Sequence, residues 1–288
     1  MEMGAFRVEQ LSEGHFRIFE DGHIRREPSS PYGHGKEGGG VPEGLRRPGY
    51  RIGIGPILVS RGDTHLLLDA GLGWGLDAGS AYGEVSNVLT NLEIFGLGAG
   101  DIAHVVLSHL HYDHAAGCTW SDAENVTRPT FPNARYHLQR AEWDDALARY
   151  DRDKVKAGAG YELDELFRLA ADGRFHFLED RETEIVPGIR VMRTGGHTPG
   201  HQAVRVGMPD EEGAFWYLGD LLPTHGQLNH YDMQHMDRDP LEAKKQKVRL
   251  LKRIYREQGV LLFYHSRHAR SGTLLRDERQ RYILNEKS

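Results

Sequence analysis

Residues 108–117 read SHLHYDHAAG and place three histidines and an aspartate within six positions. The apolar run HVVL at 104–107 precedes them and is typical of a short buried strand. Lone pairs and negative charge held this closely are costly unless a cation lies among them. Because residues i and i+2 of an extended chain point the same way, His109 and His111 can bind one ion. A turn after them can direct Asp113 and His114 at a second ion.

Three later segments also place a metal-ligand residue after an apolar run. They are IRVMRTGGHTPGH at 189–201, AFWYLGD at 214–220 and VLLFYH at 260–265. If the carboxyl ends of these strands converge, one pocket gathers seven ligands: His109, His111, Asp113, His114, His197, Asp220 and His265. Seven ligands exceed the four of a tetrahedral zinc but suit two ions that share a carboxylate. We expect Asp220 to be the bridge, because a carboxylate offers two oxygens.

The ligand types predict the kind of metal. Nitrogen and oxygen donors without thiolate suit zinc, iron, manganese or cobalt, so we expect two divalent ions, with zinc as the default. Cys118 is the single cysteine, which excludes an internal disulfide and a cysteine-rich zinc module. His201 is expected to support a ligand rather than to be one. Asp69 ends the run HLLLD and either orients a ligand histidine or starts a turn.

The remaining pattern predicts one domain over 1–288 that mixes strands and helices. Strands are expected over 5–19, 50–69, 104–109, 131–139, 175–180, 183–196, 201–208, 213–222 and 259–268, the last run ending at His265. Helical spacing is expected over 86–98, 140–150 and 240–258. Residues 28–49 are rich in Gly and Pro and predict a long loop. A helical cap or insertion is expected at about 140–175.

Composition limits the classes of partner. The net charge is −6 and both signs are mixed along the chain, so neither nucleic acid nor an acidic membrane surface is an expected partner. No apolar stretch approaches the roughly 18 residues that a membrane span needs, and the charged start lacks a signal core. We therefore expect a cytoplasmic protein acting on a small molecule. Most other histidines, among them His104, His137 and His176, are expected at ordinary surface or core positions.

The motifs HLHYDH, GGHTPGHQ, LGD and FYHS, in this order, resemble the metallo-β-lactamase superfamily of hydrolases over about residues 50–270. The resemblance implies an α/β fold, an αββα sandwich of two mixed β-sheets flanked by helices, with metals at one edge. It also implies that His109, His111 and His197 hold the first metal and that Asp113, His114 and His265 hold the second, with Asp220 between them. HTPGHQ further resembles the N-acyl homoserine lactonases and related organophosphate hydrolases, and glyoxalase II enzymes are similar there.

The expected function is a binuclear metal-dependent hydrolase that uses a bridging hydroxide on a lactone or carboxylic ester. Asp113 and Asp220 are the predicted catalytic carboxylates, and Asp113 is expected to pass the hydroxide proton to the leaving group. No G-x-S-x-G nucleophile motif is present. Alternatives on the same site are a glyoxalase II-like thioesterase and a phosphotriesterase. An iron-dependent oxidoreductase and a non-catalytic metal-binding protein are alternatives of other classes. The resemblance also allows a homodimer.

The loop after Asp220 is expected to line the substrate pocket. In the lactonases that the sequence resembles, a tyrosine shortly after the bridging aspartate contacts substrate. Here Pro223 or Thr224 stands at the matching position. The substrate-binding residues that the loop predicts are Thr224, His225 and Tyr231.

Overall fold

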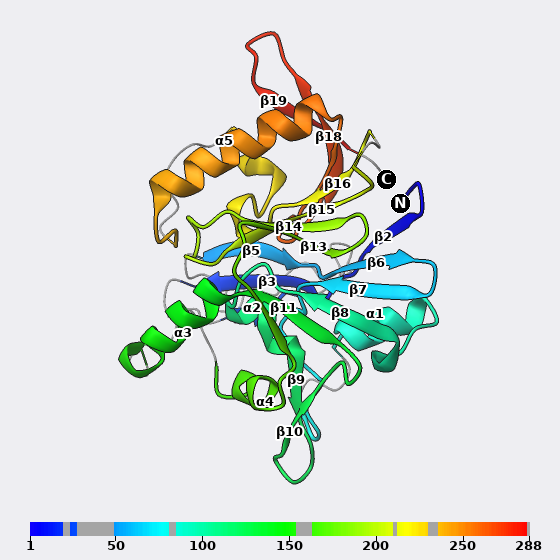
Figure 1. Ribbon diagram of the computed structural model, residues 1–288, viewed down its shortest axis with the longest axis vertical. Helices are drawn as coiled ribbons and strands as arrows, with labels where there is room; N and C mark the ends of the chain where they lie inside the picture. Colours follow the sequence, from blue (N-terminus) through cyan, green and yellow to red (C-terminus); the bar gives the residue numbers. More distant parts are fainter. Residues whose placement is uncertain are drawn as a thin grey trace, which may run out of the picture.

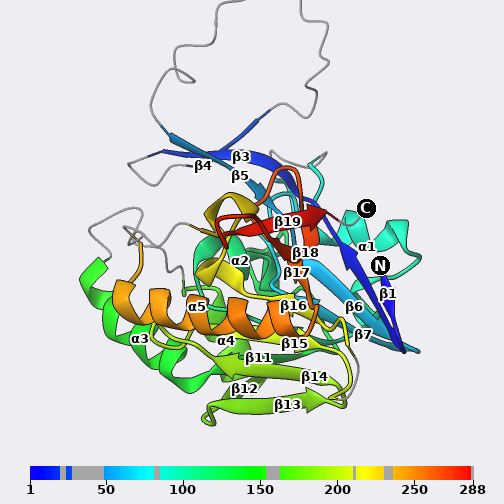
Figure 2. The ribbon, with the colours of Figure 1, turned by 90° about the horizontal axis from the view of Figure 1, so that it is seen from above.

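The computed structural model describes residues 1–19, 24–27, 49–80, 85–153, 163–209, 212–229 and 236–286. Two seven-stranded sheets lie face to face (Figures 1 and 2). The first has the order β1 (Glu2–Met3), β2 (Phe6–Gln10), β6 (Ile57–Arg61), β7 (Thr64–Leu68), β8 (Ile102–Val106), β11 (Arg135–Gln139) and β12 (Phe175–Leu178). The second has the order β13 (Glu182–Val186), β14 (Ile189–Arg193), β15 (Gln202–Val206), β16 (Phe215–Tyr217), β17 (Val260–Leu262), β18 (Ser271–Arg276) and β19 (Tyr282–Glu286).

Both sheets are mixed, as expected. The strands β7, β8, β11 and β12 are parallel, and the other pairs of the first sheet are antiparallel. In the second sheet only β16 and β17 are parallel. A parallel pair needs a crossover connection, and α5 (Pro240–Arg256) supplies it between β16 and β17.

Four layers follow from the alternation of apolar side chains along the strands. On β7, Leu66 and Leu68 belong to the core between the sheets, whereas Leu67 belongs to the core under the helices. The helices α1 (Val88–Ile94), α3 (Arg140–Asp153) and α4 (Leu166–Ala171) share that outer core. The helix α5 covers the second sheet, where Leu250 and Leu251 pack with Trp216 (Figure 1). The predicted αββα sandwich is confirmed.

The described parts of segment 140–175 belong to the outer helical layer. Trp143 and Ala146 of α3 and Leu166 and Leu169 of α4 are buried in the core on the first sheet. The cap and the single-domain organisation stay predictions. No helix in the described part of the chain is long and apolar enough to cross a lipid bilayer.

Smaller elements complete the fold. A three-stranded sheet has the order β4 (Ile24–Arg26), β3 (Gly14–Phe19) and β5 (Gly49–Ile54), and β9 (Thr119–Ser121) pairs with β10 (Thr127–Pro129). Among the described residues, the short helix α2 (Tyr112–Ala115) and the 3₁₀ turns Ala99–Asp101, Ala116–Cys118, Gly219–Leu221 and His225–Gln227 lie between strands. The predicted loop 28–49 lies outside the described residues except for Gly49, which begins β5 rather than ending a loop.

Two strand predictions need correction. The run 50–69 does not stay in one sheet: the chain changes sheets between β5 and β6, at Gly55 and Pro56, and β6 then pairs with β7. The last strand is not the one that ends at His265. The chain continues into the antiparallel hairpin of β18 and β19, which forms the edge of the second sheet.

The strands that precede the predicted ligands end at one side of the sandwich. His109 follows β8, His197 follows β14, Asp220 follows β16 and His265 follows β17. The parallel pairing of β16 with β17 places Tyr217 opposite Leu262, so the segments after both strands leave the sheet side by side. The fold therefore brings sequence-distant ligand residues to one edge.

Candidate metal centre

All seven predicted ligand side chains come together, and they form two groups. The first contains His109, His111, His197 and Asp220, and the second contains Asp113, His114 and His265. Within each group the ligand atoms lie within 4.8 Å of one another. The backbone explains the split, because His111 is extended and α2 begins at the next residue. Asp113 and His114 thus lie on a helical turn that directs them away from His109 and His111.

The first group has the spacing of donors around an ion. His111 Nδ1 lies 2.9 Å from His109 Nε2 and 3.1 Å from His197 Nε2. Ligands of a tetrahedral ion with metal–nitrogen bonds of 2.0–2.1 Å lie about 3.3 Å apart. Burial, and then neighbouring histidines, hold the pKa of His109 and of His111 well below the usual value. Neutral imidazoles keep a lone pair for a metal.

The second group is arranged in the same way. His114 Nε2 lies 3.1 Å from His265 Nε2, and Asp113 Oδ2 lies 3.4 Å from His265 Nε2. The ring of Tyr264 stacks on His114 with centroids 4.2 Å apart, and its hydroxyl donates to the Asp113 carbonyl at 2.8 Å. The stacking holds the plane of the His114 ring, and the hydrogen bond holds the backbone of Asp113.

Asp220 lies between the two groups. Its Oδ1 atom is 3.3 Å from His114 Nε2 and 3.2 Å from His265 Nε2, whereas Oδ2 is 3.6 Å from His197 Nε2. Oδ1 is buried and has no hydrogen bond from the described residues. Burial raises the pKa of Asp220, but His265 and His114 outweigh burial and hold it well below the usual value. A buried, ionised oxygen without a hydrogen bond fits a cation at this position.

Acceptors or donors outside the cluster engage the second ring nitrogen of four of the five histidines. The contacts to Nδ1 are Ser108 Oγ to His109 at 2.9 Å, Asp69 Oδ2 to His114 at 2.7 Å, Asp237 Oδ1 to His197 at 2.9 Å and the Gly53 carbonyl to His265 at 2.9 Å. Such partners fix the ring orientation and leave Nε2 for a metal. His201 accepts from the Asp220 N–H at 3.2 Å, which agrees with a supporting position.

Asp69 contacts the predicted ligand His114 and lies just after β7. Besides His114, it accepts from the Ser108 N–H at 2.6 Å, the Ser108 hydroxyl at 2.7 Å and the Tyr217 hydroxyl. Its φ of 59° is left-handed, so the strand ends there.

Asp237 and Glu142 are positioning residues that the sequence did not reveal. Glu142, in the first turn of α3, is fully buried. Its Oε1 accepts from the Leu110 N–H at 3.1 Å, and its Oε2 accepts from the Thr198 hydroxyl at 2.6 Å and the Gly200 N–H at 3.1 Å. One carboxylate therefore joins the segment that carries His109 and His111 to the loop that carries His197.

The predicted substrate residues lie near His265 where the structure describes them. The His225 N–H donates to Ser266 Oγ at 3.1 Å, and the neighbouring Pro223 carbonyl accepts from the His265 N–H at 3.0 Å. Thr224 is half-buried at the start of the 3₁₀ turn. Tyr231 lies outside the described residues. Contact of these residues with substrate stays a prediction.

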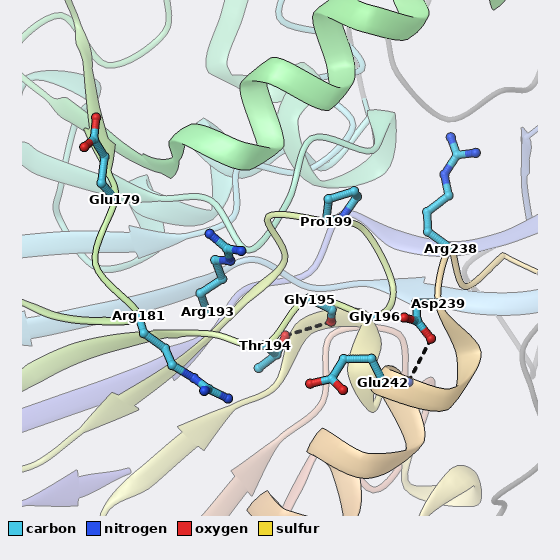
Figure 3. Close-up of a pocket in the computed structure, with 10 residues that line it drawn as sticks. All are labelled: Glu179, Arg181, Arg193, Thr194, Gly195, Gly196, Pro199, Arg238, Asp239 and Glu242. Atoms are coloured by element: carbon cyan, nitrogen blue, oxygen red, sulfur yellow. Dashed lines mark hydrogen bonds between the residues drawn. The ribbon is translucent and has the colours of Figure 1, made fainter.

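A hollow of about 650 Å³ lies against the backbone of the His197 loop (Figure 3). Gly195, Gly196 and Pro199 form one side, and Arg238 and Glu242, at the start of α5, form another. None of the seven ligand side chains lines it. We therefore do not assign the reacting substrate to this hollow.

Known proteins share the sequence pattern and the fold. An N-acyl homoserine lactonase of Bacillus thuringiensis is 24% identical over 184 residues, 63% of either chain. Another, from Rhizobium radiobacter, is 25% identical over 181 residues, covering 57% of this chain and 63% of the relative. The alignments thus span less than two thirds of the length of these curated relatives.

Solved structures show the fold over the whole chain. The dizinc quorum-quenching lactonase AidC, solved with a product N-acyl homoserine, has a TM-score of 0.71 at 20% identity and covers 100% of this chain and 97% of its own. The hydrolase AbOPH has a TM-score of 0.72 at 19% identity, covering 100% and 96%. The family model described as the metallo-beta-lactamase superfamily matches residues 56–265. The chain therefore belongs to the metallo-beta-lactamase superfamily.

Proposed function

We propose that this protein is a binuclear metal-dependent hydrolase of lactones or carboxylic esters. The observation that carries the proposal is the position of Asp220, whose two oxygens face different ligand groups. His109, His111 and His197 would hold one divalent ion and Asp113, His114 and His265 a second, with Asp220 shared. When bound, two such ions would polarise a carbonyl oxygen and lower the pKa of a metal-bound water to about 7.

The chain's own residues orient the reaction. The outer partners Ser108, Asp69 and Asp237 keep the ring nitrogens of His109, His114 and His197 directed into the cluster. This preorganisation avoids reorganising the site as charge develops on the substrate. Zinc is the proposed metal, because the donors are nitrogen and oxygen and the dizinc lactonase AidC shares the fold.

Asp113 and Asp220 are the proposed proton-handling groups. Each retains 14% exposure of its side chain, whereas His109 and His114 are fully buried. A carboxylate at the open side of the cluster can accept the proton of an attacking water and return it to the leaving alkoxide. Asp113 is the better placed of the two for this transfer, because Asp220 would be engaged by both metals.

The names of the relatives support the substrate class. Lactonases stand among both the sequence relatives and the solved structures. A lactone and a carboxylic ester share the tetrahedral transition state that a polarising cation stabilises. The proposed substrate is thus a small lactone, with acyclic esters as slower substrates.

The test is hydrolysis by the zinc-loaded protein of an N-acyl homoserine lactone, an aryl ester, a thioester and a phosphotriester. We expect the lactone to give the highest kcat/KM, a chelator to abolish turnover and added zinc to restore it. Asp220→Asn should lose at least about 10²-fold in kcat/KM, more than removal of an outer partner costs. Asp144→Asn, exposed on α3, is the matched control. Turnover that survives chelation, or a preferred thioester or phosphotriester, would contradict the proposal.

A further inference from the structure

Three histidines outside the seven-residue cluster form a stripe across the first sheet. His104 lies on β8, His137 on β11 and His176 on β12, which are adjacent and parallel. His137 is paired directly with His176. Val106 and Leu178 follow His104 and His176 by two positions, so they point to the same face, and both belong to the core between the sheets. The three imidazoles therefore share the sheet face that looks toward the second sheet.

The rings are close enough to interact. His104 Nδ1 lies 3.0 Å from His137 Nε2, and the ring centroids of His137 lie 5.1 Å from His104 and 5.2 Å from His176. His137 is 3% exposed, His104 is half-buried and His176 is exposed. The stripe thus runs from a buried imidazole to one that solvent reaches.

One nitrogen of this stripe lacks a partner. His137 Nδ1 is buried and accepts or donates no hydrogen bond among the described residues. A hydrogen bond between His137 and His104 satisfies only the Nε2 atom, because the two ring nitrogens point in diverging directions. With Nε2 directed at β8, Nδ1 is directed to the other flank of β11, where β12 carries His176. Leaving a buried polar atom without a partner is unfavourable.

The surroundings of His137 keep its imidazole neutral. Burial, then His104, His176 and Arg135, lowers the pKa of His137 to about 3. Burial, then Arg135 and His176, also lowers the pKa of His104. His137 is therefore neutral at pH 7. With a proton on Nε2 that is donated to His104, its Nδ1 carries a lone pair.

We propose that His137 Nδ1 and His176 form a third metal site, for a borderline transition-metal ion such as Zn²⁺, with His104 orienting His137. Histidine pairs suit zinc, copper and nickel, and solvent water completes the coordination. A ligand histidine with its other nitrogen held by a partner matches the arrangement in the main cluster. None of the three histidines belongs to either ligand group of the main cluster, and His176 lies on β12, one strand further from β8 than β11.

The test is a titration of Zn²⁺ into protein that already holds two zinc ions, followed by calorimetry. We expect one additional ion per chain, and anomalous density beside His137. His176→Ala should remove this binding. His104→Ala should weaken it by roughly 10–100-fold, as loss of an outer partner does. His65→Ala is the control, because His65 lies on the same sheet and belongs to neither the stripe nor the main cluster; its Nδ1 lies 2.8 Å from Ser60 Oγ.

Each outcome decides the proposal. No additional ion, or an additional ion that His176→Ala still binds, would overturn the site. Unchanged affinity in His104→Ala would overturn the orienting role. Because none of these residues belongs to the seven-residue cluster, lactone hydrolysis should stay at the level of the unaltered protein in all three variants. The third site can therefore fail while the proposed hydrolase stands, and the reverse also holds.

Discussion

His114 Nδ1 lies 2.7 Å from Asp69 Oδ2, and both side chains are fully buried. The contact directs His114 Nε2 at Asp220, 3.3 Å away. Burial lowers the pKa of His114, but Asp220, Asp113 and Asp69 outweigh burial and raise it well above the usual value. Without a cation in the cluster, a proton on His114 balances the carboxylates, so metal binding at this group should release protons.

Asp69→Asn tests this relationship. The amide keeps the size but removes the charge and one acceptor, so we expect zinc at the second group to bind roughly 10–100-fold more weakly. The first group should weaken less, because Asp69 reaches it only through Ser108, whose hydroxyl contacts His109. Stepwise competition with a chelator measures both affinities. Asp63→Asn, in the exposed turn between β6 and β7, is the control. Equal loss at both groups, or no loss, would contradict this account of Asp69.

Glu142 should control the first group. Glu142→Gln replaces one oxygen by an N–H₂ group that cannot accept from Thr198 or Gly200, so the two ligand segments lose a shared partner. We expect zinc at the first group to weaken roughly 10–100-fold and kcat to fall more than KM rises. Thr198→Val should give a milder loss, and Thr198→Ser, which keeps the hydroxyl, should restore binding.

The control for Glu142 is Asp144→Asn on the same helix, at an exposed position. A purely structural role would lower the melting temperature of Glu142→Gln without changing the ratio of the two zinc affinities. That result would show that Glu142 does not position the first group.

Alanine substitutions at two adjacent glycines of the His197 loop distinguish backbone strain from steric contact with α5. Gly195 and Gly196 have φ of 63° and 86°, so alanine at either costs about 1–2 kcal/mol of left-handed strain. A Cβ on Gly196 would lie 2.5 Å from the Ala243 backbone on α5, whereas the nearest atom to a Cβ on Gly195 is 3.7 Å away. Chemical denaturation should show Gly196→Ala less stable than Gly195→Ala, and zinc binding should weaken with it. Equal losses of stability in the two variants would mean that α5 shifts to accommodate the added Cβ without a measurable cost.

Glu13 should make stability depend on pH. Burial raises the pKa of Glu13 to about 8, against backbone N–H groups that lower it, among them Leu72 at 2.7 Å. An acid whose folded pKa is raised favours folding at low pH, so its contribution is lost as pH rises from about 4.5 to about 8. At 1.36 kcal/mol per pKa unit this is on the order of a few kcal/mol.

Glu13→Gln removes this titration and keeps an acceptor for Leu72. The free energy of unfolding of the unaltered protein should fall, relative to that of Glu13→Gln, between pH 5 and roughly pH 8.5. Urea denaturation of both proteins across this range measures the difference. A constant difference across the range would show that Glu13 does not titrate with folding.

The ligand set could be predicted because each member lies just after a strand. The apolar runs before His109, His197, Asp220 and His265 mark strands of a layered fold, and such strands deliver the residues after them to one edge. The spacing of His109 and His111, then a turn, predicts the division into two groups that the structure has. Short-range periodicity was sufficient for these residues.

Other features depend on contacts that sequence periodicity does not encode. Asp237 meets His197 across 40 positions, and Glu142 meets Thr198 across 56. The hairpin of β18 and β19 was missed because its apolar runs, Leu274–Leu275 and Tyr282–Leu284, are only two and three residues long. Its turn is held by Asp277, which accepts from Arg281. The stripe of His104, His137 and His176 depends on the order of three parallel strands.

The most direct test of the central claim is anomalous scattering at the zinc edge from crystals of the zinc-loaded protein. We expect one peak among His109, His111 and His197, another among Asp113, His114 and His265, and Asp220 in contact with both. In Asp220→Ala crystals both peaks should weaken. A single peak in the cluster, or loss of only one peak from Asp220→Ala, would contradict a shared carboxylate and with it the binuclear site.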